Sequence, residues 1–380
     1  MECGECLIDG LLSGMMLMAC LHGLLLAGIF LFHPRFNAKS NQFLAMAILG
    51  VCVMVCYEFF AWTEMEDYVP AWVDYIPFYI RSTIPVGLAY FTLFLINPKH
   101  QLSTIERLGI WAIGLEVFLH LLFVPIDFFF AEAENLEDII EYLVAAGWLL
   151  GIIVCLILLP LAIQRVNRYQ KYLLDNYSNT HKRSLAWLRH FLSLVLGLSV
   201  LQIISLAQFI IGYEEAGEFT FLLITLGFII LLFWIGYALI LNYGWFQIVP
   251  IKESSDLPPN TSTKLSSKTN IYHHQLLQLL QEEKAYEDTD LTLDRLSEQL
   301  DISSGYLSQI INEKEGKNFF DLINHYRIQA VKERLLDQEF ANYTIMGIAL
   351  ECGFKSKSTF NAVFKKFTGL TPSSYRKMHV

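Results

Sequence analysis

The chain has 380 residues, which is enough for two or more domains. Hydrophobic residues make up 54% of it and charged residues only 17%, whereas a typical soluble protein carries about 25% charged residues. This balance excludes a chain that is soluble throughout and predicts a membrane domain. The net charge of −10 is unevenly spread, because residues 1–250 hold 11 basic and 20 acidic side chains and residues 251–380 hold 16 and 17.

Seven apolar runs are each long enough to cross about 30 Å of hydrocarbon, which takes about 20 helical residues. The alternative, core helices of a soluble protein, fits poorly with seven such runs joined by short charged loops. We therefore expect a seven-helix transmembrane domain over residues 1–250. The runs are Leu7–Phe32, Asn41–Phe60, Tyr75–Ile96, Leu108–Phe130, Ile139–Ile163, Trp187–Ile211 and Phe219–Tyr243.

The loops between these runs alternate in charge. The loops after the first, third and fifth runs are basic, and the intervening loops contain acidic residues but no Lys or Arg. Basic loops stay on the cytoplasmic side of a membrane. This pattern predicts a multi-pass protein of the bacterial cytoplasmic membrane, with its N-terminus outside and its C-terminal domain in the cytoplasm.

A few ionisable residues fall inside the apolar runs. Glu116 and His120 are four residues apart in the fourth run, and Glu58 and Arg81 lie near the outer ends of the second and third. Ionisable groups in lipid are costly and often mark a functional site. We expect these four residues to line a signal pocket, and the alternative is that they pair with one another or reach the interface.

The sequence favours neither a metal site nor catalysis. Cys3 and Cys6 form a lone C-x-x-C pair, and four other cysteines lie in apolar runs. The hydrolase and nucleotide-binding motifs H-E-x-x-H, G-x-S-x-G and the Walker loop are absent. We therefore expect no enzyme, cofactor or metal. A transporter or an enzyme with a regulatory C-terminal tail remains the alternative, although the runs lack the many Gly and Pro breaks of transporters.

Residues 251–270 are rich in Ser, Thr, Lys and Pro and have no apolar period, so they are predicted to be a flexible linker. Helical patterns follow over residues 271–286, 291–300, 303–314 and 319–336. Thr292 is placed to cap the second of these helices, and Gly316 to end the third. The second and third form a helix-turn-helix, and the fourth is a longer connecting helix.

The last part of the chain is a second helix-turn-helix. The residues from Ile348 to Arg376 read I-A-L-E-C-G-F-K-S-K-S-T-F-N-A-V-F-K-K-F-T-G-L-T-P-S-S-Y-R. Gly353 suits the corner between the helices, and Ser356 can cap the second helix. In that helix Phe360, Val363, Phe364 and Phe367 fall on one inward face, which leaves a polar and basic face outside.

This stretch resembles the AraC/XylS family of bacterial transcription regulators. The pattern I-A-x-x-x-G-F-x-S-x-S-x-F-x-x-x-F-K-K-x-x-G-x-T-P-x-x-Y-R is met at every fixed position, and the likeness extends over about the last 110 residues. The resemblance implies a double helix-turn-helix domain over residues 271–380. It also implies that the second helices of the two units enter successive major-groove turns of duplex DNA, about 34 Å apart.

The resemblance also implies which side chains meet DNA. Gln and Asn can pair with adenine, Lys with guanine, and Ser with either base. Lysine and arginine on phosphates set the register and the salt dependence of binding. The base-facing positions are Gly305, Ser308, Gln309, Asn312, Lys357, Ser358, Asn361 and Ala362. The phosphate-facing positions are Lys355, Lys365, Lys366, Arg376 and Lys377.

The first unit departs from the family where Asn312-Glu313 replaces the Phe-Lys or basic pair of many members, so it offers the DNA backbone little charge. Taken together, these features predict a membrane-bound, sequence-specific transcription regulator. The expected partners are promoter DNA, the lipid bilayer and a small-molecule or envelope signal sensed by the membrane domain. A signal that changes the pairing of two chains is compatible with a homodimer.

Overall fold

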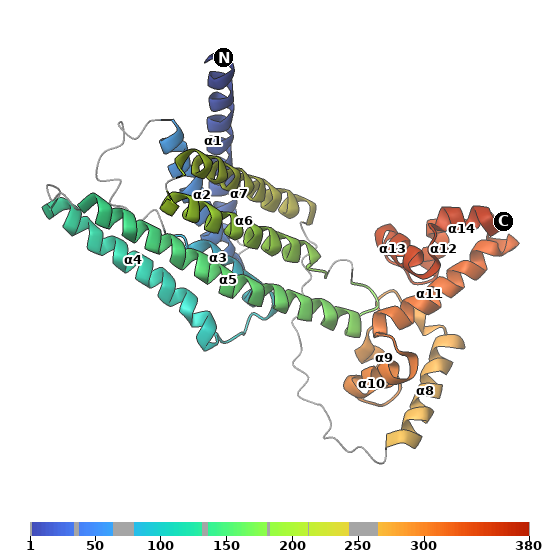
Figure 1. Cartoon of the computed structure of the whole chain (residues 1–380). Helices are drawn as coiled ribbons and strands as arrows, with labels where there is room; N and C mark the ends of the chain where they lie inside the picture. The colour runs from blue at the N-terminus through green and yellow to red at the C-terminus, as the bar shows by residue number, and fades with distance from the viewer. Residues whose placement is uncertain are drawn as a thin grey trace. The chain divides into compact units, whose positions relative to one another are not determined.

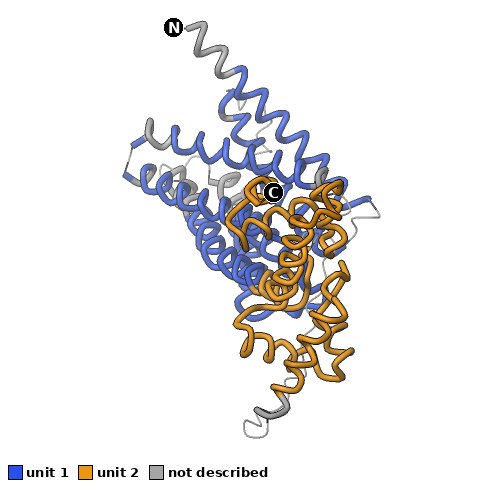
Figure 2. The backbone as a smooth tube through the Cα atoms, turned by 90° about the vertical axis from the view of Figure 1, so that its right-hand side faces the viewer, with its two compact units in different colours: residues 1–167, 185–250 blue, residues 168–184, 251–380 orange. Residues whose placement is uncertain are grey.

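The computed structural model describes residues 2–33, 38–63, 80–130, 136–180, 183–211, 213–242 and 265–379 (Figure 1). Within these ranges every regular element is a helix, apart from one isolated bridge between Tyr177 and Thr292. The all-α fold class expected from the sequence is confirmed. The chain divides into two compact units, one of residues 1–167 and 185–250 and the other of residues 168–184 and 251–380 (Figure 2).

The first unit contains the helices that coincide with the seven apolar runs. Helix α1 packs on α2 and α7, α2 packs on α3, and α6 packs on α7. Close approach of α2 and α3 depends on Gly87, where a Cβ would lie 2.7 Å from the Phe43 carbonyl oxygen. The helices are α1 Glu2–Phe32, α2 Lys39–Trp62, α3 Thr83–Ile96, α4 Thr104–Phe130, α5 Leu136–Asn176, α6 Ala186–Ile211 and α7 Glu214–Asn242.

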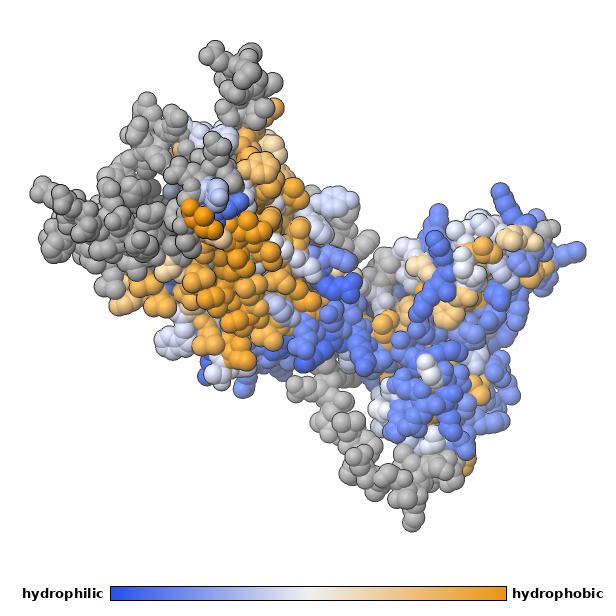
Figure 3. Space-filling model, viewed as in Figure 1, coloured by the Kyte–Doolittle hydropathy of each residue, from blue (hydrophilic) through white to orange (hydrophobic). Residues whose placement is uncertain are grey.

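Large apolar side chains are exposed on the outside of this unit, where Figure 3 shows an extended apolar surface. On α1, Met18 and Leu25 are 65% and 63% exposed, and on α4 Trp111 is 72% exposed. Soluble monomers rarely expose contiguous apolar surface of this extent. Helices in contact with lipid satisfy their backbone internally and present such side chains outward. The first unit is therefore compatible with a membrane domain.

Among the described residues, five helices are long and apolar enough to cross a membrane, and α3 is a shorter apolar helix. Part of α4 falls outside the residues whose side chains are described, so the predicted count of seven spans stays a prediction. Helix α5 continues to Asn176, well past the end of its predicted run at Ile163. Its last turns, from Arg168 onward, belong to the second unit.

The second unit is built on the central helix α11, Phe319–Leu336, which has the predicted bounds. Helices on either side of it close one apolar core around Leu307, Phe319, Ile323, Phe354 and Phe364. The other helices are α8 Leu265–Gln281, α9 Leu293–Gln299, α10 Ser304–Glu315, α12 Ile345–Glu351, α13 Lys357–Thr368 and α14 Pro372–His379, with the 3-10 turns η4 Ala285–Glu287 and η5 Gln338–Phe340.

Two local features differ from the sequence expectation. Residues 265–270, predicted to be the end of a linker, already form the first turns of α8, and residues 251–264 lie outside the described residues. Residues 168–184 pack with the C-terminal unit, although the sequence groups them with the membrane domain. The second feature has no local sequence signal, because it arises from tertiary contacts.

Candidate nucleic-acid interface

The first helix-turn-helix unit consists of α9 and α10. The Thr292 hydroxyl accepts a hydrogen bond from the Arg295 backbone N–H and caps α9, as predicted. The Ser303 hydroxyl accepts one from the Tyr306 N–H and caps α10. Gly316 ends α10 with a φ of 63°, the left-handed conformation that favours glycine. Side-chain caps thus fix the start of each of the two helices, and the Ser303 cap lies at the corner between them.

The second helix-turn-helix unit consists of α12 and α13, and side-chain hydroxyls cap the start of both helices. The Thr344 hydroxyl accepts a hydrogen bond from the Gly347 N–H, and the Ser356 hydroxyl accepts one from the Thr359 N–H. Gly369 ends α13 with a φ of 75°. These short helices are defined by their caps as well as by their core contacts, since each cap satisfies backbone donors that otherwise lack partners.

Gly353 forms the corner between α12 and α13. Its φ is 90°, which side chains other than glycine rarely adopt. A Cβ on this residue would lie 2.5 Å from the Tyr286 carbonyl oxygen and 2.8 Å from the Arg327 Nε. Both backbone conformation and space therefore require glycine here, which places the second unit directly against α11.

The predicted base-facing residues of the second unit lie on the outer face of α13. Lys357, Ser358, Asn361 and Ala362 are all exposed. The opposite face of the same helix buries Phe360, Val363 and Phe364 in the core. The helix therefore presents an exposed and mostly polar surface at the positions predicted to face the bases.

In the first helix-turn-helix unit, Gly305, Gln309 and Asn312 are exposed on α10, and Ser308 is half-buried. The Gln309 side chain donates to the Glu313 carboxylate over 2.7 Å. The Asn312 amide lies 3.5 Å from the Ser308 hydroxyl. An adenine contact by Gln309 therefore requires that this amide first leave Glu313.

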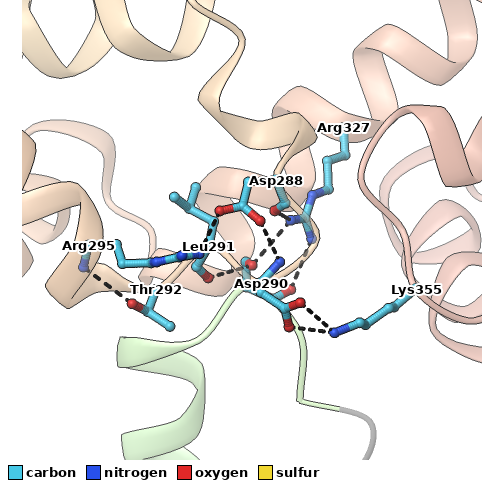
Figure 4. A network of polar contacts seen from close by, with 8 residues as sticks. Asp288, Asp290, Leu291, Thr292, Arg295, Arg327 and Lys355 are labelled. Atoms are coloured by element: carbon cyan, nitrogen blue, oxygen red, sulfur yellow. Dashed lines mark hydrogen bonds and ion pairs between the residues drawn. The ribbon is translucent and has the colours of Figure 1, made fainter.

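Two of the predicted phosphate-binding lysines are paired with acidic residues of the same unit. The Lys355 Nζ lies 2.5 and 2.6 Å from the two carboxylate oxygens of Asp290, as Figure 4 shows. The Lys366 Nζ lies 2.6 Å from Asp321. Lys365 and Lys377 are exposed. The positive charge available to DNA is thus lower than the sequence count of lysines indicates.

The Lys355 pair also sets the charge state of Asp290. The hydrogen bond from Lys355, reinforced by the charges of Lys355 and Arg183, holds the pKa of the Asp290 carboxyl below its ordinary value of 3.8. Asp290 is therefore ionised across the physiological pH range. In the predicted phosphate contact of Lys355, the Asp290 charge would compete with the phosphate for this lysine.

Arg376 has several contacts within its own unit. Its guanidinium donates to the backbone carbonyls of Tyr343, Phe340 and Ala341, at 3.2, 3.4 and 2.8 Å. These bonds tie α14 to the segment between α11 and α12. The phosphate contact expected from the family stays a prediction, and it would have to share the guanidinium with these carbonyls.

Arg327 lies on α11 and faces the core of its unit. It is 1% exposed, and its guanidinium donates to the Tyr286 carbonyl oxygen at 2.8 Å. It also donates to the Asp288 carbonyl oxygen at 2.7 Å (Figure 4). Burial lowers its pKa to about 10, so it stays charged at neutral pH. Helical spacing could find its inward position, but its carbonyl partners carry no sequence pattern.

The predicted signal-site residues belong to the compact unit of residues 1–167 and 185–250. Glu116 accepts hydrogen bonds from the Ser82 N–H at 3.0 Å and from the Ser82 hydroxyl at 2.8 Å, next to the start of α3. The Arg81 guanidinium lies 3.9 Å from the Trp148 ring centroid and lines a small cavity. Glu58 is buried, and the His120 side chain lies outside the described residues. Glu116 thus has a structural role, and a signal-binding role for these four residues stays a prediction.

Comparison with known proteins matches residues 296–378 to the family described as "Helix-turn-helix domain". An uncharacterised HTH-type transcriptional regulator of Staphylococcus aureus (strain COL) is 40% identical over 87 residues, 23% of this chain and 11% of that protein. The regulator YtdP of Bacillus subtilis (strain 168) is 31% identical over 90 residues, 24% of this chain and 11% of that protein. The chain thus spans only about a tenth of the length of these relatives.

Among solved structures, the C-terminal domain of AraT, a response regulator from Geobacillus stearothermophilus, is 29% identical, with a TM-score of 0.25. The match covers 30% of this chain and 88% of that one. The family match covers both capped helix-turn-helix units, and the sequence pattern from Ile348 to Arg376 covers the second of them. Residues 296–378 therefore form a DNA-binding helix-turn-helix domain of the AraC type.

Proposed function

We propose that this chain is a membrane-bound transcription regulator that couples a signal sensed by its first unit to promoter binding by its AraC-type domain. The observation that carries the proposal is the presence of both parts in one polypeptide. Helices with apolar exposed surfaces precede a DNA-binding domain whose recognition helix α13 presents Lys357, Ser358 and Asn361 outward. The HTH-type relatives favour regulation of transcription over enzyme activity.

The mechanism follows from the two recognition helices. Helices α10 and α13 enter successive major-groove turns, where Gln309, Asn361 and Lys357 read base edges. Lys365 and Lys377 contact phosphates, and Lys355 and Lys366 join them when they leave their carboxylates. The first helix-turn-helix unit offers little positive charge. The second helix-turn-helix unit therefore supplies most of the electrostatic attraction to the DNA backbone.

The proposal is tested by chromatin immunoprecipitation of the full-length chain from washed membranes. We expect enrichment of discrete promoter fragments that share a motif with two half-sites about one helical turn apart. The matched control is the full-length Asn361→Ala variant, which keeps the membrane unit. It lacks one predicted base contact and should therefore enrich the same fragments less strongly. Uniform recovery of genomic DNA, or recovery only in the soluble fraction, would contradict the proposal.

Orientation is a separate part of the proposal. The alternating loop charges support an extracytoplasmic N-terminus and a cytoplasmic C-terminal domain. We expect green fluorescent protein fused after Val380 to fluoresce and alkaline phosphatase at the same place to be inactive. The reverse pair of activities would show that the domain cannot reach the chromosome.

A further inference from the structure

Residues 168–184, which we call the coupling segment, carry a contact that neither the sequence pattern nor the family match anticipates. They belong to the same compact unit as the AraC-type domain (Figure 2). Ser178 is 1% exposed. Its backbone N–H and its hydroxyl both donate to the Leu291 carbonyl oxygen, at 3.3 and 2.7 Å. The adjacent Tyr177 forms an antiparallel bridge with Thr292, the cap of α9.

Two buried side chains of α11 complete the site that holds Ser178. The Arg327 guanidinium donates to the Ser178 carbonyl oxygen and hydroxyl, each at 3.2 Å. The Asn324 amide donates to the same carbonyl at 3.3 Å. We call Leu291, Asn324 and Arg327 the Ser178 seat. Departure of the coupling segment would leave a buried charge and a buried amide with fewer partners, which is costly.

The seat touches both helix-turn-helix units. On one side, Leu291 lies next to Thr292 and so to the start of α9. On the other, Arg327 meets the α12–α13 corner, because a Cβ on Gly353 would lie 2.8 Å from its Nε and the Phe354 ring centroid is 5.9 Å from its guanidinium. The bonds to Tyr286 and Asp288 hold the segment before α9 against the same guanidinium. One buried cation thus links the coupling segment to both DNA-reading units.

The coupling segment begins inside an apolar helix, because its first nine residues, 168–176, are the last turns of α5. Helix α5 ends at Asn176, two residues before Ser178, and residues 146–176 of that helix qualify as a membrane span by length and hydropathy. Arg183, on the other side of Ser178, helps to hold the pKa of Asp290 down and so favours the Asp290–Lys355 pair. Only Tyr177 separates the end of α5 from Ser178 in the chain.

We propose that occupation of the Ser178 seat by the coupling segment is the step by which the membrane unit controls the DNA-binding domain. The seated segment fixes Arg327 and with it the relative placement of α9–α10 and α12–α13. Two recognition helices held at a fixed spacing bind two major-groove turns without first losing conformational freedom. A signal that withdraws α5 vacates the seat and weakens operator binding. This proposal rests on the proposed function.

The test uses the full-length chain in nanodiscs and the duplex that it enriches most strongly from a random 30-base-pair library. Ser178→Ala removes the hydroxyl contacts to Leu291 and Arg327 and leaves the backbone intact. At about 1 kcal/mol for each of the two hydrogen bonds, we expect it to weaken duplex binding by up to roughly 30-fold. Ser184→Ala is the matched control in the same segment, since its hydroxyl bonds to Gln170, and we expect a change below about twofold.

A second measurement needs no variant. Coupling between two sites is reciprocal, so bound duplex must stabilise the seated state of the wild-type chain. We expect the duplex to slow amide hydrogen exchange in the peptide that contains Ser178, by the same factor by which an empty seat weakens binding. A segment that only supports folding would be slowed by DNA no more than a core peptide of the same unit, such as the one that contains Ile323.

The outcomes separate the two proposals. Failure to enrich any duplex would contradict the proposed function itself. Enrichment followed by unchanged or tighter binding of Ser178→Ala, or by exchange at Ser178 that ignores the duplex, would overturn only the role of the seat. If Ser178→Ala loses helicity by circular dichroism, the wild-type exchange measurement decides alone.

Discussion

Individual residues determine whether the two helix-turn-helix units can pack on α11. Gly353 combines a φ of 90° with contacts that leave no room for a Cβ, whereas Gly369 has a φ of 75° and open space around the Cβ position. The sequence pattern predicts a glycine at each helix end but cannot distinguish these two cases. The distinction depends on Tyr286 and Arg327, which lie far away in the chain and reach Gly353 only in the folded unit.

We predict that Gly353→Ala destabilises the second helix-turn-helix unit, α12 and α13, more than Gly369→Ala does. Both substitutions place alanine in the left-handed region, at a cost of about 1–2 kcal/mol. Gly353→Ala adds an overpacking cost of about 1–3 kcal/mol. The measurement is the opening free energy of peptides from α12 and α13 by hydrogen exchange in the full-length protein. Equal losses in the two variants would show that the corner is not tightly packed against Arg327.

Asp290 provides a second prediction for a single residue. Asp290→Asn should release Lys355 to a DNA phosphate, strengthen binding to all sequences alike and steepen the salt dependence by about one charge. Glu298→Gln, an exposed change of the same charge on α9, controls for net charge. The measurement is duplex affinity against salt concentration. Equal salt slopes for the two variants would mean that Lys355 does not contact the backbone.

The pH dependence of this effect follows from the lowered pKa of Asp290. A carboxyl with a lowered folded pKa contributes its ion pair above its unfolded pKa and loses it as the pH falls through the folded pKa. That window lies below the ordinary value of 3.8. The difference in affinity between Asp290→Asn and the wild type should therefore stay constant from pH 8 to pH 5, and a difference that shrinks within this range would contradict the assignment.

Among the helices, the two recognition helices differ in charge although they share a capped design. Helix α13 carries Lys357, Lys365 and Lys366, whereas the single lysine of α10, Lys314, is close to Glu313 and Glu315 in the chain. The resulting asymmetry predicts that affinity depends mainly on α13. The first helix-turn-helix unit then contributes mainly sequence preference, through Gln309 and Asn312, and less attraction to the DNA backbone.

We predict that Lys365→Ala with Lys366→Ala weakens binding to every duplex and lowers the salt slope by about two charges. Lys314→Ala is the control on α10, where the loss should be smaller than one charge because of the neighbouring carboxylates. Fluorescence anisotropy over a salt series measures both. A slope that is unchanged in the double variant would show that these two lysines do not touch phosphate.

Helix boundaries in the C-terminal unit follow from local signals, and the longer contacts do not. Caps at Thr292 and Ser356 and the bounds of α11 could be predicted because each depends on residues a few positions apart. The bonds of Arg327 to Ser178 join residues 149 apart, and backbone carbonyls have no sequence signature. For the same reason the assignment of residues 168–184 to the C-terminal unit could not be predicted.

For the whole molecule, the sequence and the structure agree on a helical chain that ends in an AraC-type domain. Length and hydropathy locate the helices of the first unit because a membrane span needs a long apolar run. They do not determine which helices touch or what the unit binds. The Ser82–Glu116 contact illustrates this limit, since a predicted signal residue proves to be hydrogen-bonded to the residue before α3.

Flotation of the full-length chain with DNA tests the central claim, that one polypeptide is held in a bilayer while its tail binds duplex DNA. The chain is reconstituted into liposomes, mixed with the enriched duplex and spun through a density gradient. We predict that chain and duplex rise together with the lipid and that the Lys365→Ala, Lys366→Ala variant rises while most of its duplex stays behind. A wild-type chain that remains at the bottom, or that floats without the duplex, would contradict the account.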